Sequence, residues 1–178
     1  QKQLEPEATA AKIMNAPGYR EPIPWLGTLE QLETLVGLLF QNHLIENEDK
    51  ELLIGQHFHD TINGNRLPLP DGISPDPMHM IQWTGVQAQL RYLFEHLVHK
   101  ELGKLVDWEG VRYSFISQHF YNQRAGKVFA PKNLKRIPMD NFSEKRAMVI
   151  RSIFGKLIGK TPKPAPPKKF PELDQLWL

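Results

Sequence analysis

The chain has 178 residues, of which 40% are hydrophobic and 24% charged, a balance typical of a folded protein. It contains no cysteine, which excludes disulfides, thiolate catalysis and cysteine zinc sites. No apolar run approaches the roughly 18 residues that a membrane span needs, and no secretory signal is visible, so we expect a cytoplasmic protein that does not bind membranes.

The net charge of +2 conceals a gradient along the chain. Residues 21–70 carry eight acidic and two basic side chains, and residues 71–130 carry six of each kind. Residues 131–169 carry eleven basic and two acidic side chains. The C-terminal third therefore favours an anionic partner, while a solvated basic face is the plain alternative.

One pattern of residues occurs twice. Six early residues recur at a constant offset: Ile23, Trp25, Gly27, Gln31, Leu32 and Leu35 match Ile81, Trp83, Gly85, Gln89, Leu90 and Leu93. The segment Ile54–Phe58 then matches Ile116–Phe120 at an offset four residues larger. One insertion of four residues around Leu102–Val106 reconciles the two offsets. We interpret the pattern as a duplicated helical unit.

The patterns divide the chain into an arm, two helical units, a linker and a tail. The expected bounds are 1–22 for the arm, 23–67 for the acidic first unit, 68–80 for the proline-rich linker, 81–160 for the second unit with its basic final helix, and 161–178 for a proline-rich spacer and hydrophobic docking tail. We predict a mainly α fold of two tandem winged-helix or helix-turn-helix-like three-helix units with short hairpins.

The first unit begins with a strong helix signal. Thr28 and Gln31 have capping-box spacing, and the apolar residues that follow recur at intervals of three and four. Asn47 is the expected N-cap of a second helix, and Asn63-Gly64 predicts a tight turn. In each unit a tryptophan precedes the first helix, at Trp25 and Trp83. We expect both indoles to fill the core.

The second unit repeats this plan and extends it. Thr84 and Gln87 predict a capping box for a helix near 86–101 that ends at Gly103. Leu105-Val106 is a candidate strand, and Asp107 is the expected cap of the next helix. Further on, Pro131 predicts the start of a short helix, and Ser143 predicts the cap of a last helix near 143–159.

Four residues near the C-terminus are too apolar for a solvated tail. They follow a spacer that has four prolines and three lysines within residues 161–169. We therefore expect the tail to dock, either on this chain or on a neighbour. The candidate docking residues are Phe170, Leu173, Leu176 and Trp177.

The histidines do not form a recognisable metal motif. His57 and His59 would point apart on a helix, and His96 and His99 share a face without a third ligand. His57 and His119 occupy equivalent repeat positions, which favours a role in the scaffold. No phosphate loop, nucleophile elbow or metalloprotease helix is present. We therefore expect no enzymatic activity, no cofactor and no metal.

The strongest functional signal lies after Ile116. A helix is followed by a turn at Gly126, a short basic segment and a basic amphipathic helix, an order in which winged-helix domains place cations on DNA phosphates. Asn122, Gln123 and Asn141 are further candidates for base contacts. The candidate DNA-binding residues are Arg124, Lys127, Lys132, Asn133, Lys135, Arg136, Lys145 and Arg146.

The second unit resembles the C-terminal domain of RteC-like regulators, which control excision of conjugative transposons. The resemblance covers roughly residues 80–160 and rests on Ile81–Gly85, Gln89-Leu90, Phe115–Phe120, Lys132–Leu134 and Lys145-Arg146. It implies a helix-turn-helix-like domain, binding of double-stranded DNA and a role in transcription regulation of a mobile element. The acidic first unit and the hydrophobic tail depart from the family pattern.

Two interpretations follow from the sequence. The first is a non-enzymatic DNA-binding regulatory protein that uses the basic second unit on the phosphate backbone. The second is a protein–protein adaptor of similar fold, which docks a partner or a second copy through the acidic first unit or the tail.

Overall fold

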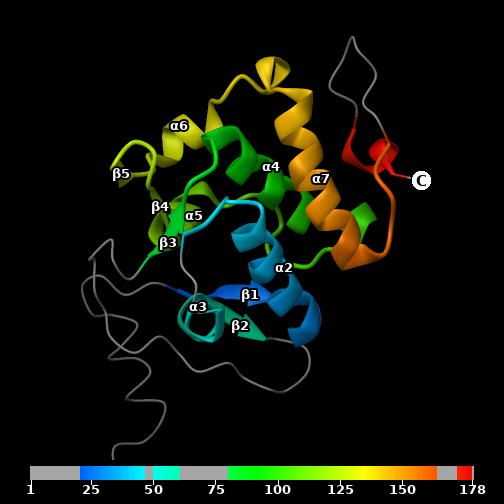
Figure 1. Cartoon of the computed structure of the whole chain (residues 1–178), viewed down its shortest axis with the longest axis horizontal. Helices are drawn as coiled ribbons and strands as arrows, with labels where there is room; N and C mark the ends of the chain where they lie inside the picture. Colours follow the sequence, from blue (N-terminus) through cyan, green and yellow to red (C-terminus); the bar gives the residue numbers. More distant parts are fainter. Residues whose placement is uncertain (1–20, 47–49, 61–79, 164–171, 178) are drawn as a thin grey trace, which may run out of the picture.

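The computed structural model describes residues 21–46, 50–60, 80–163 and 172–177, which form a mainly helical protein with two small sheets (Figure 1). The helices of the described residues are α2 (Leu29–Gln41), α3 (Lys50–His57), α4 (Gln87–Leu97), α5 (Tyr113–His119), α6 (Pro131–Lys135) and α7 (Glu144–Ile158). The strands are β1 (Ile23–Trp25), β2 (Phe58–Asp60), β3 (Ile81–Trp83), β4 (Phe120–Asn122) and β5 (Lys127–Val128). Three 3₁₀ helices complete the set, η2 (Lys100–Leu102), η3 (Met139–Asn141) and η4 (Leu173–Leu176).

The predicted duplication is visible in the strand pairing. β1 pairs in parallel with β2, with Ile23 opposite Phe58. β3 pairs in parallel with β4 in the equivalent register, with Ile81 opposite Phe120. In both units the strand before the first helix thus pairs with the strand that directly follows the second helix. Parallel strands need a crossover between them, and the two helices of each unit provide it.

Each tryptophan belongs to a local hydrogen-bonded motif that is the same in both units. The indole N–H of Trp25 donates to the Thr28 carbonyl (2.9 Å), and that of Trp83 donates to the Val86 carbonyl (3.1 Å). The rings are fully buried, and each meets the equivalent phenylalanine edge-on, with centroids 6.1 Å apart for Trp25–Phe58 and 6.0 Å apart for Trp83–Phe120. The prediction that the indoles fill the core is confirmed.

The two units bond to each other reciprocally. In one direction the Leu26 amide donates to the Leu105 carbonyl (2.7 Å), and in the other the Thr84 amide donates to the Leu44 carbonyl (2.8 Å). Isolated bridges pair Trp25 with Val106 and Ile45 with Trp83. Such an exchange of equivalent contacts is the signature of a two-fold relation, here inside a single chain.

The equivalent histidines of the two units contact each other, as the pseudo-two-fold relation between the units predicts. Nδ1 of His57 lies 2.9 Å from Nδ1 of His119, and both rings are fully buried. Nε2 of His119 donates to the Glu21 carbonyl (2.6 Å), so with one proton on each ring the hydrogen bond runs from Nδ1 of His57 to Nδ1 of His119. The histidines therefore join the units, which agrees with a scaffold role.

Helix α7 packs against α2 of the first unit and α4 of the second (Figure 1). Gln31 Nε2 donates to the Leu157 carbonyl (2.9 Å), and Gln89 Nε2 donates to the Arg146 carbonyl (3.3 Å). The same two glutamines accept, at Oε1, the amides of Thr28 and Val86 that begin their helices. Each glutamine therefore caps its own helix and fixes one end of α7.

The cap of α2 is confirmed, and that of α4 is two residues from its expected place. Thr28 and Gln31 form the full capping box. In α4 the N-cap is Val86 and the capping glutamine is Gln89. The Thr84 hydroxyl instead donates to the His43 carbonyl of the other unit (2.6 Å), so the contact between units overrides the local pattern.

The connection between α4 and α5 also differs from expectation. α4 ends at Leu97, and Gly103, with φ of +98°, ends the separate turn η2. Asp107 caps no helix, because its amide donates to the Pro24 carbonyl (2.9 Å) and α5 begins only at Tyr113. Trp108 instead stacks on Phe94, with centroids 5.5 Å apart. The expected N-cap Asn47 and the Asn63-Gly64 turn lie outside the described residues.

The last helices and the tail agree with the sequence pattern. α6 begins at Pro131, and α7 has Ser143 as its N-cap residue, although the Ser143 side chain makes no capping hydrogen bond. Leu176 and Trp177 are buried on this chain, with Trp177 against Phe154 (ring centroids 5.7 Å apart). The tail therefore docks in cis. Phe170 lies outside the described residues.

Replacement of Gly85 by alanine should lower the free energy of unfolding by about 1–3 kcal/mol. The added Cβ would lie 2.7 Å from Leu44 Cδ2, 2.8 Å from Gln89 Oε1 and 3.1 Å from Trp83 Nε1. Gly110→Ala is the matched control, because nothing lies within 4 Å of its Cβ position. Urea denaturation measures both variants. Equal stability of the two would show that close packing at Gly85 is unimportant.

Candidate nucleic-acid interface

The hairpin of β4 and β5 is held by its own residues. Tyr121 pairs with Val128 in an antiparallel ladder, and Gly126 adopts a φ of +67° in the turn. Asn122 closes the turn, since its Oδ1 accepts the Ala125 amide (3.2 Å) and its carbonyl accepts the Gly126 amide (2.9 Å). Asn122 is also buried, so its expected role in base contacts is wrong.

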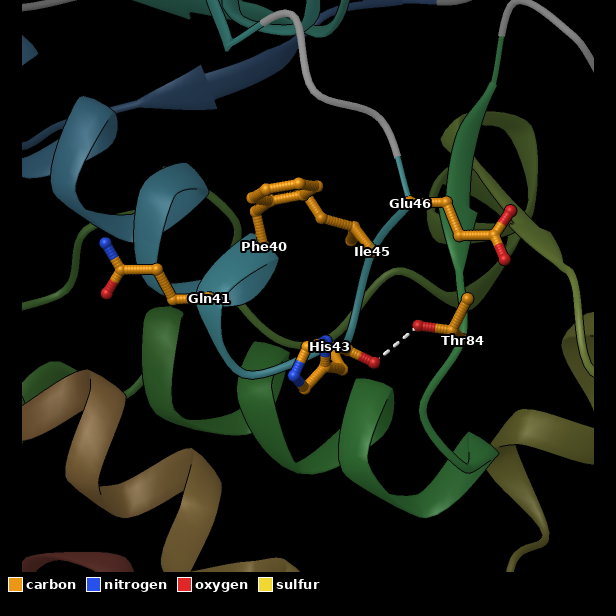
Figure 2. A pocket seen from close by; sticks show the side chains of 6 residues that line it. All are labelled: Phe40, Gln41, His43, Ile45, Glu46 and Thr84. Atoms are coloured by element: carbon orange, nitrogen blue, oxygen red, sulfur yellow. Dashed lines mark hydrogen bonds between the residues drawn. The ribbon is translucent and has the colours of Figure 1, made fainter.

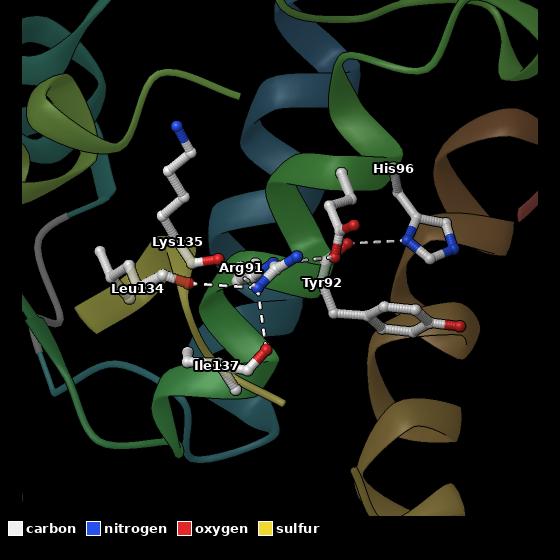
Figure 3. A network of polar contacts seen from close by, with 7 residues as sticks. Arg91, Tyr92, His96, Leu134, Lys135 and Ile137 are labelled. Atoms are coloured by element: carbon white, nitrogen blue, oxygen red, sulfur yellow. Dashed lines mark hydrogen bonds and ion pairs between the residues drawn. The ribbon is translucent and has the colours of Figure 1, made fainter. Parts of the chain in front are cut away.

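Helix α6 follows this hairpin and is fixed by an arginine of α4. Nη1 of Arg91 reaches the carbonyl oxygens of Leu134 (3.4 Å), Lys135 (2.9 Å) and Ile137 (3.0 Å) (Figure 3). These carbonyls at the end of a short helix have no full set of intrahelical partners, and the guanidinium supplies donors to them. Leu134 is fully buried beneath α6. The exposed side of α6 is thus held in a defined orientation.

All eight predicted DNA-binding residues are exposed. Arg124 and Lys127 lie on the hairpin, four residues lie on α6 or at its C-cap, and two lie in the first turn of α7. Two ion pairs occur among the described residues, and neither includes any of the eight. The hairpin and α6 groups are consecutive in the chain, whereas Lys145 and Arg146 follow after a connection that contains η3.

A buried polar network joins α4 to α7 beside this surface. Tyr92 and His96 project from α4 toward α7, on the side away from Arg91 (Figure 3). Nη1 of Arg151 donates to the Tyr92 hydroxyl (3.0 Å), and Nη2 forms a close ion pair with Glu144. Arg151 is fully buried, and burial raises the pKa of Tyr92. Glu144 is therefore paired with Arg151. Asp140 is the second of the two acidic residues within 131–169.

His96 is a buried neutral histidine. Its Nδ1 donates to the Tyr92 carbonyl (2.8 Å), and the ring packs against Phe154 with centroids 5.2 Å apart. Burial, with smaller contributions from the charges of Arg151 and His99, lowers the pKa of His96 to about 4. The ring is therefore uncharged at neutral pH, and its role is packing.

The described residues contain no group of three or more histidine, cysteine, aspartate or glutamate side chains that could hold a metal ion. His96 is engaged with Tyr92 and lies in an aromatic cluster, and His57 is engaged with His119.

The first unit presents a different surface. A depression of about 610 Å³ is lined by Phe40, Gln41, His43, Ile45, Glu46 and Thr84, at the junction of the two units (Figure 2). Its lining includes the carboxylate-bearing Glu46 and the two residues of the Thr84–His43 hydrogen bond between the units. Glu30 and Glu33 are exposed on α2, and their negative charges oppose the binding of phosphates there.

Sequence reasoning missed the two arginines that organise the second unit. Arg91 has a signal in the sequence, because Glu95 lies four residues later on the same helix face and forms an ion pair with it (3.6 Å). Arg151 falls four residues after Ala147, in the apolar stripe of α7. A charged residue within such a stripe indicates a buried ion pair or hydrogen-bond network.

Comparison of the chain with protein-family models, curated proteins and solved structures gives no match. The resemblance to RteC-like regulators therefore stays a prediction. Within the described parts of the chain, no helix is both long and apolar enough to cross a bilayer.

Replacement of Arg91 by methionine should loosen α6, because three carbonyl oxygens lose the guanidinium donor. We expect the free energy of unfolding to fall by about 1–3 kcal/mol. Backbone amides of α6 should also exchange faster with solvent, whereas those of α2 should not. Arg124→Met removes an exposed arginine of the hairpin and should change stability by less than about 0.5 kcal/mol. Unchanged exchange in α6 would exclude the proposed role of Arg91.

The depressed pKa of His96 predicts a loss of stability in acid. Between about pH 4 and the ordinary value of 6.5, the unfolded chain binds a proton that the folded chain does not. The contribution of the neutral His96 ring to the free energy of unfolding is therefore fully present above pH 6.5. It falls by about 3 kcal/mol as the pH decreases to 4. Urea denaturation at several pH values measures the effect. His96→Asn, which retains a donor for the Tyr92 carbonyl, should show a flatter profile; an identical profile would contradict the prediction.

Proposed function

We propose that this chain is a non-enzymatic DNA-binding regulatory protein that grips the phosphate backbone of duplex DNA with its second unit. The observation that carries the proposal is the exposure of the basic residues on the β4–β5 hairpin, on α6 and its C-cap, and in the first turn of α7. These seven cations make no ion pairs with the described residues, so they are available to phosphates. Phosphate contacts supply most of the sequence-independent affinity of such proteins.

The order of elements supports a winged-helix type of binding by the second unit. Helix α5 precedes the hairpin, as a recognition helix precedes its wing, and Ser114 and Gln118 are exposed on it. We propose that α5 faces the major groove and that Arg124 and Lys127 contact the flanking backbone. Asn133, Gln123 and Asn141 are exposed and remain candidates for polar contacts with DNA.

The first unit has a supporting role in this proposal. It holds one end of α7 through Gln31 and supplies half of the contacts between units. Its exposed acidic residues oppose close approach of phosphate, which confines DNA to the second unit. Control of a mobile element, as in RteC-like regulators, is the biological role that the sequence resemblance suggests.

An adaptor function is the second candidate. The acidic surface of α2 and the depression beside Phe40, which is 39% exposed, favour a basic or amphipathic protein partner. Docking of a partner through Leu176 and Trp177 would require their release, because both are buried on this chain.

Duplex affinity measured against salt concentration tests the DNA proposal. We expect the logarithm of the association constant to fall with the logarithm of salt, by about 0.9 for each phosphate neutralised. Fluorescence anisotropy with a labelled random-sequence duplex gives this slope. A flat plot, or binding too weak to detect at low salt, would exclude DNA binding.

Matched triple variants locate the interface. Lys127→Gln, Lys132→Gln and Arg136→Gln together should weaken binding and reduce the magnitude of the slope by up to about 3. Lys100→Gln, Lys156→Gln and Lys160→Gln remove three exposed lysines elsewhere and should have a much smaller effect. Equal losses in both triple variants would indicate a diffuse charge effect instead of the proposed surface.

A further inference from the structure

A stack of planar side chains runs from the core to the surface directly before α5. The buried Trp108 stacks on Phe94, with ring centroids 5.5 Å apart, and on Phe115, with centroids 6.0 Å apart. The guanidinium of Arg112 lies over the Phe115 ring, with Cζ 3.8 Å from the ring centroid. An arginine on an aromatic face is held by a cation–π contact. The stack therefore fixes one exposed cation on a platform that is anchored in the core.

The charge of Arg112 is not balanced by a carboxylate of the described residues. Two ion pairs occur among them, and neither includes Arg112, although Asp107 and Glu109 lie in the same loop. The side chain is exposed, and a guanidinium presents its N–H donors as a planar fork. Arg112 therefore offers a positioned fork of donors to an acceptor outside the protein.

Arg91 places Arg112 beside the basic residues of α6. The Arg91 guanidinium lies over the Tyr113 ring, 5.9 Å from its centroid, and donates to the Lys135 carbonyl (2.9 Å). Tyr113 is the first residue of α5 and Lys135 is the last of α6, so the start of one helix and the end of the other meet at one side chain. Arg112, Lys135 and Arg136 are all exposed at this end of the helix pair.

The loop that precedes α5 favours a neutral acceptor over a phosphate. Residues 107–112 line a depression of about 400 Å³, and Asp107 and Glu109 are exposed on this loop. Their carboxylates oppose the approach of a phosphate to Arg112. The edge of a base carries no net charge, and guanine presents there two acceptors, O6 and N7, that match the guanidinium fork. Guanine is therefore the partner in duplex DNA that suits this arginine.

We propose that Arg112 recognises a guanine in the major groove by donating hydrogen bonds to its O6 and N7 atoms. The inference rests on the proposed function, in which α5 faces the major groove. It adds sequence recognition to that function, because the phosphate contacts of the hairpin and α6 do not distinguish one base pair from another. The Phe115 platform orients the guanidinium before DNA binds, so less side-chain freedom is lost in the complex.

Selection of duplexes from a random library by the full-length chain tests for this recognition. The selected duplexes should share a G·C pair. Replacing its guanine by 7-deazaguanine removes N7 but keeps Watson–Crick pairing, and this should weaken binding of the unsubstituted chain about tenfold. Arg112→Lys keeps the charge but loses the planar fork, so it should bind both duplexes with nearly equal affinity. Fluorescence anisotropy measures the four affinities.

Arg124→Lys is the matched control, because Arg124 is an exposed arginine of the hairpin to which the proposed function gives a phosphate contact. This variant should retain the roughly tenfold preference for guanine over 7-deazaguanine. Equal sensitivity of the unsubstituted chain and Arg112→Lys to 7-deazaguanine would overturn the proposal, since another group would then recognise the base.

Arg112→Met separates base recognition from phosphate contact. On a random-sequence duplex its salt dependence should equal that of the unsubstituted chain, because the arginine contacts no phosphate. A slope smaller by about 0.9 would assign Arg112 to a phosphate and overturn the proposal. Duplex binding without a preference for guanine would overturn this inference alone, whereas absence of duplex binding would overturn the proposed function as well.

Discussion

The amides of Leu26 and Thr84 each donate to a carbonyl of the opposite repeat unit, at Leu105 and Leu44. These two residues directly follow β1 and β3, which are three residues long, and such short strands need packing against other elements to be stable. Each strand also accepts a hydrogen bond from the other unit, at the Pro24 carbonyl from the Asp107 amide and at the Gln82 carbonyl from the Glu46 amide. The apolar residues of both units accordingly form one continuous core. The two repeats therefore share one hydrophobic core.

The repeat made much of this architecture predictable from the sequence. Trp25, Gln31 and their counterparts have one constant offset because each set performs one local task, such as capping a helix or filling the core. The backbone hydrogen bonds between the two units could not be predicted from the sequence in this way. Leu44 and Leu105 accept these hydrogen bonds through their backbone carbonyls, and such a bond does not require a particular side chain. Thr84 illustrates the consequence, because its local capping pattern is overridden by a bond to the other unit.

The candidate interface was predictable as a set of residues but not as a surface. Charge and turn signals are local, so they identified the exposed cations of the hairpin and α6. The orientation of α6 depends on Arg91, which is 43 residues from Leu134 in the chain and has no local signal for that contact. Asn122 shows an error of another kind, because the sequence identified the residue but predicted the wrong role for it. Its amide resembles a group that contacts bases, yet the hairpin uses it internally.

The direction of α7 explains how a symmetric scaffold presents an asymmetric surface. A groove between two equivalent helices could receive α7 in either direction, because Gln31 and Gln89 offer the same donor at its two ends. Arg151 removes this choice, since it bonds to Tyr92, whose counterpart at the repeat offset is the exposed Thr34. Likewise Arg91, which holds α6, corresponds to Glu33. A few substitutions in the duplicated helix therefore direct the basic first turn of α7 to the second unit and leave the acidic unit at its other end.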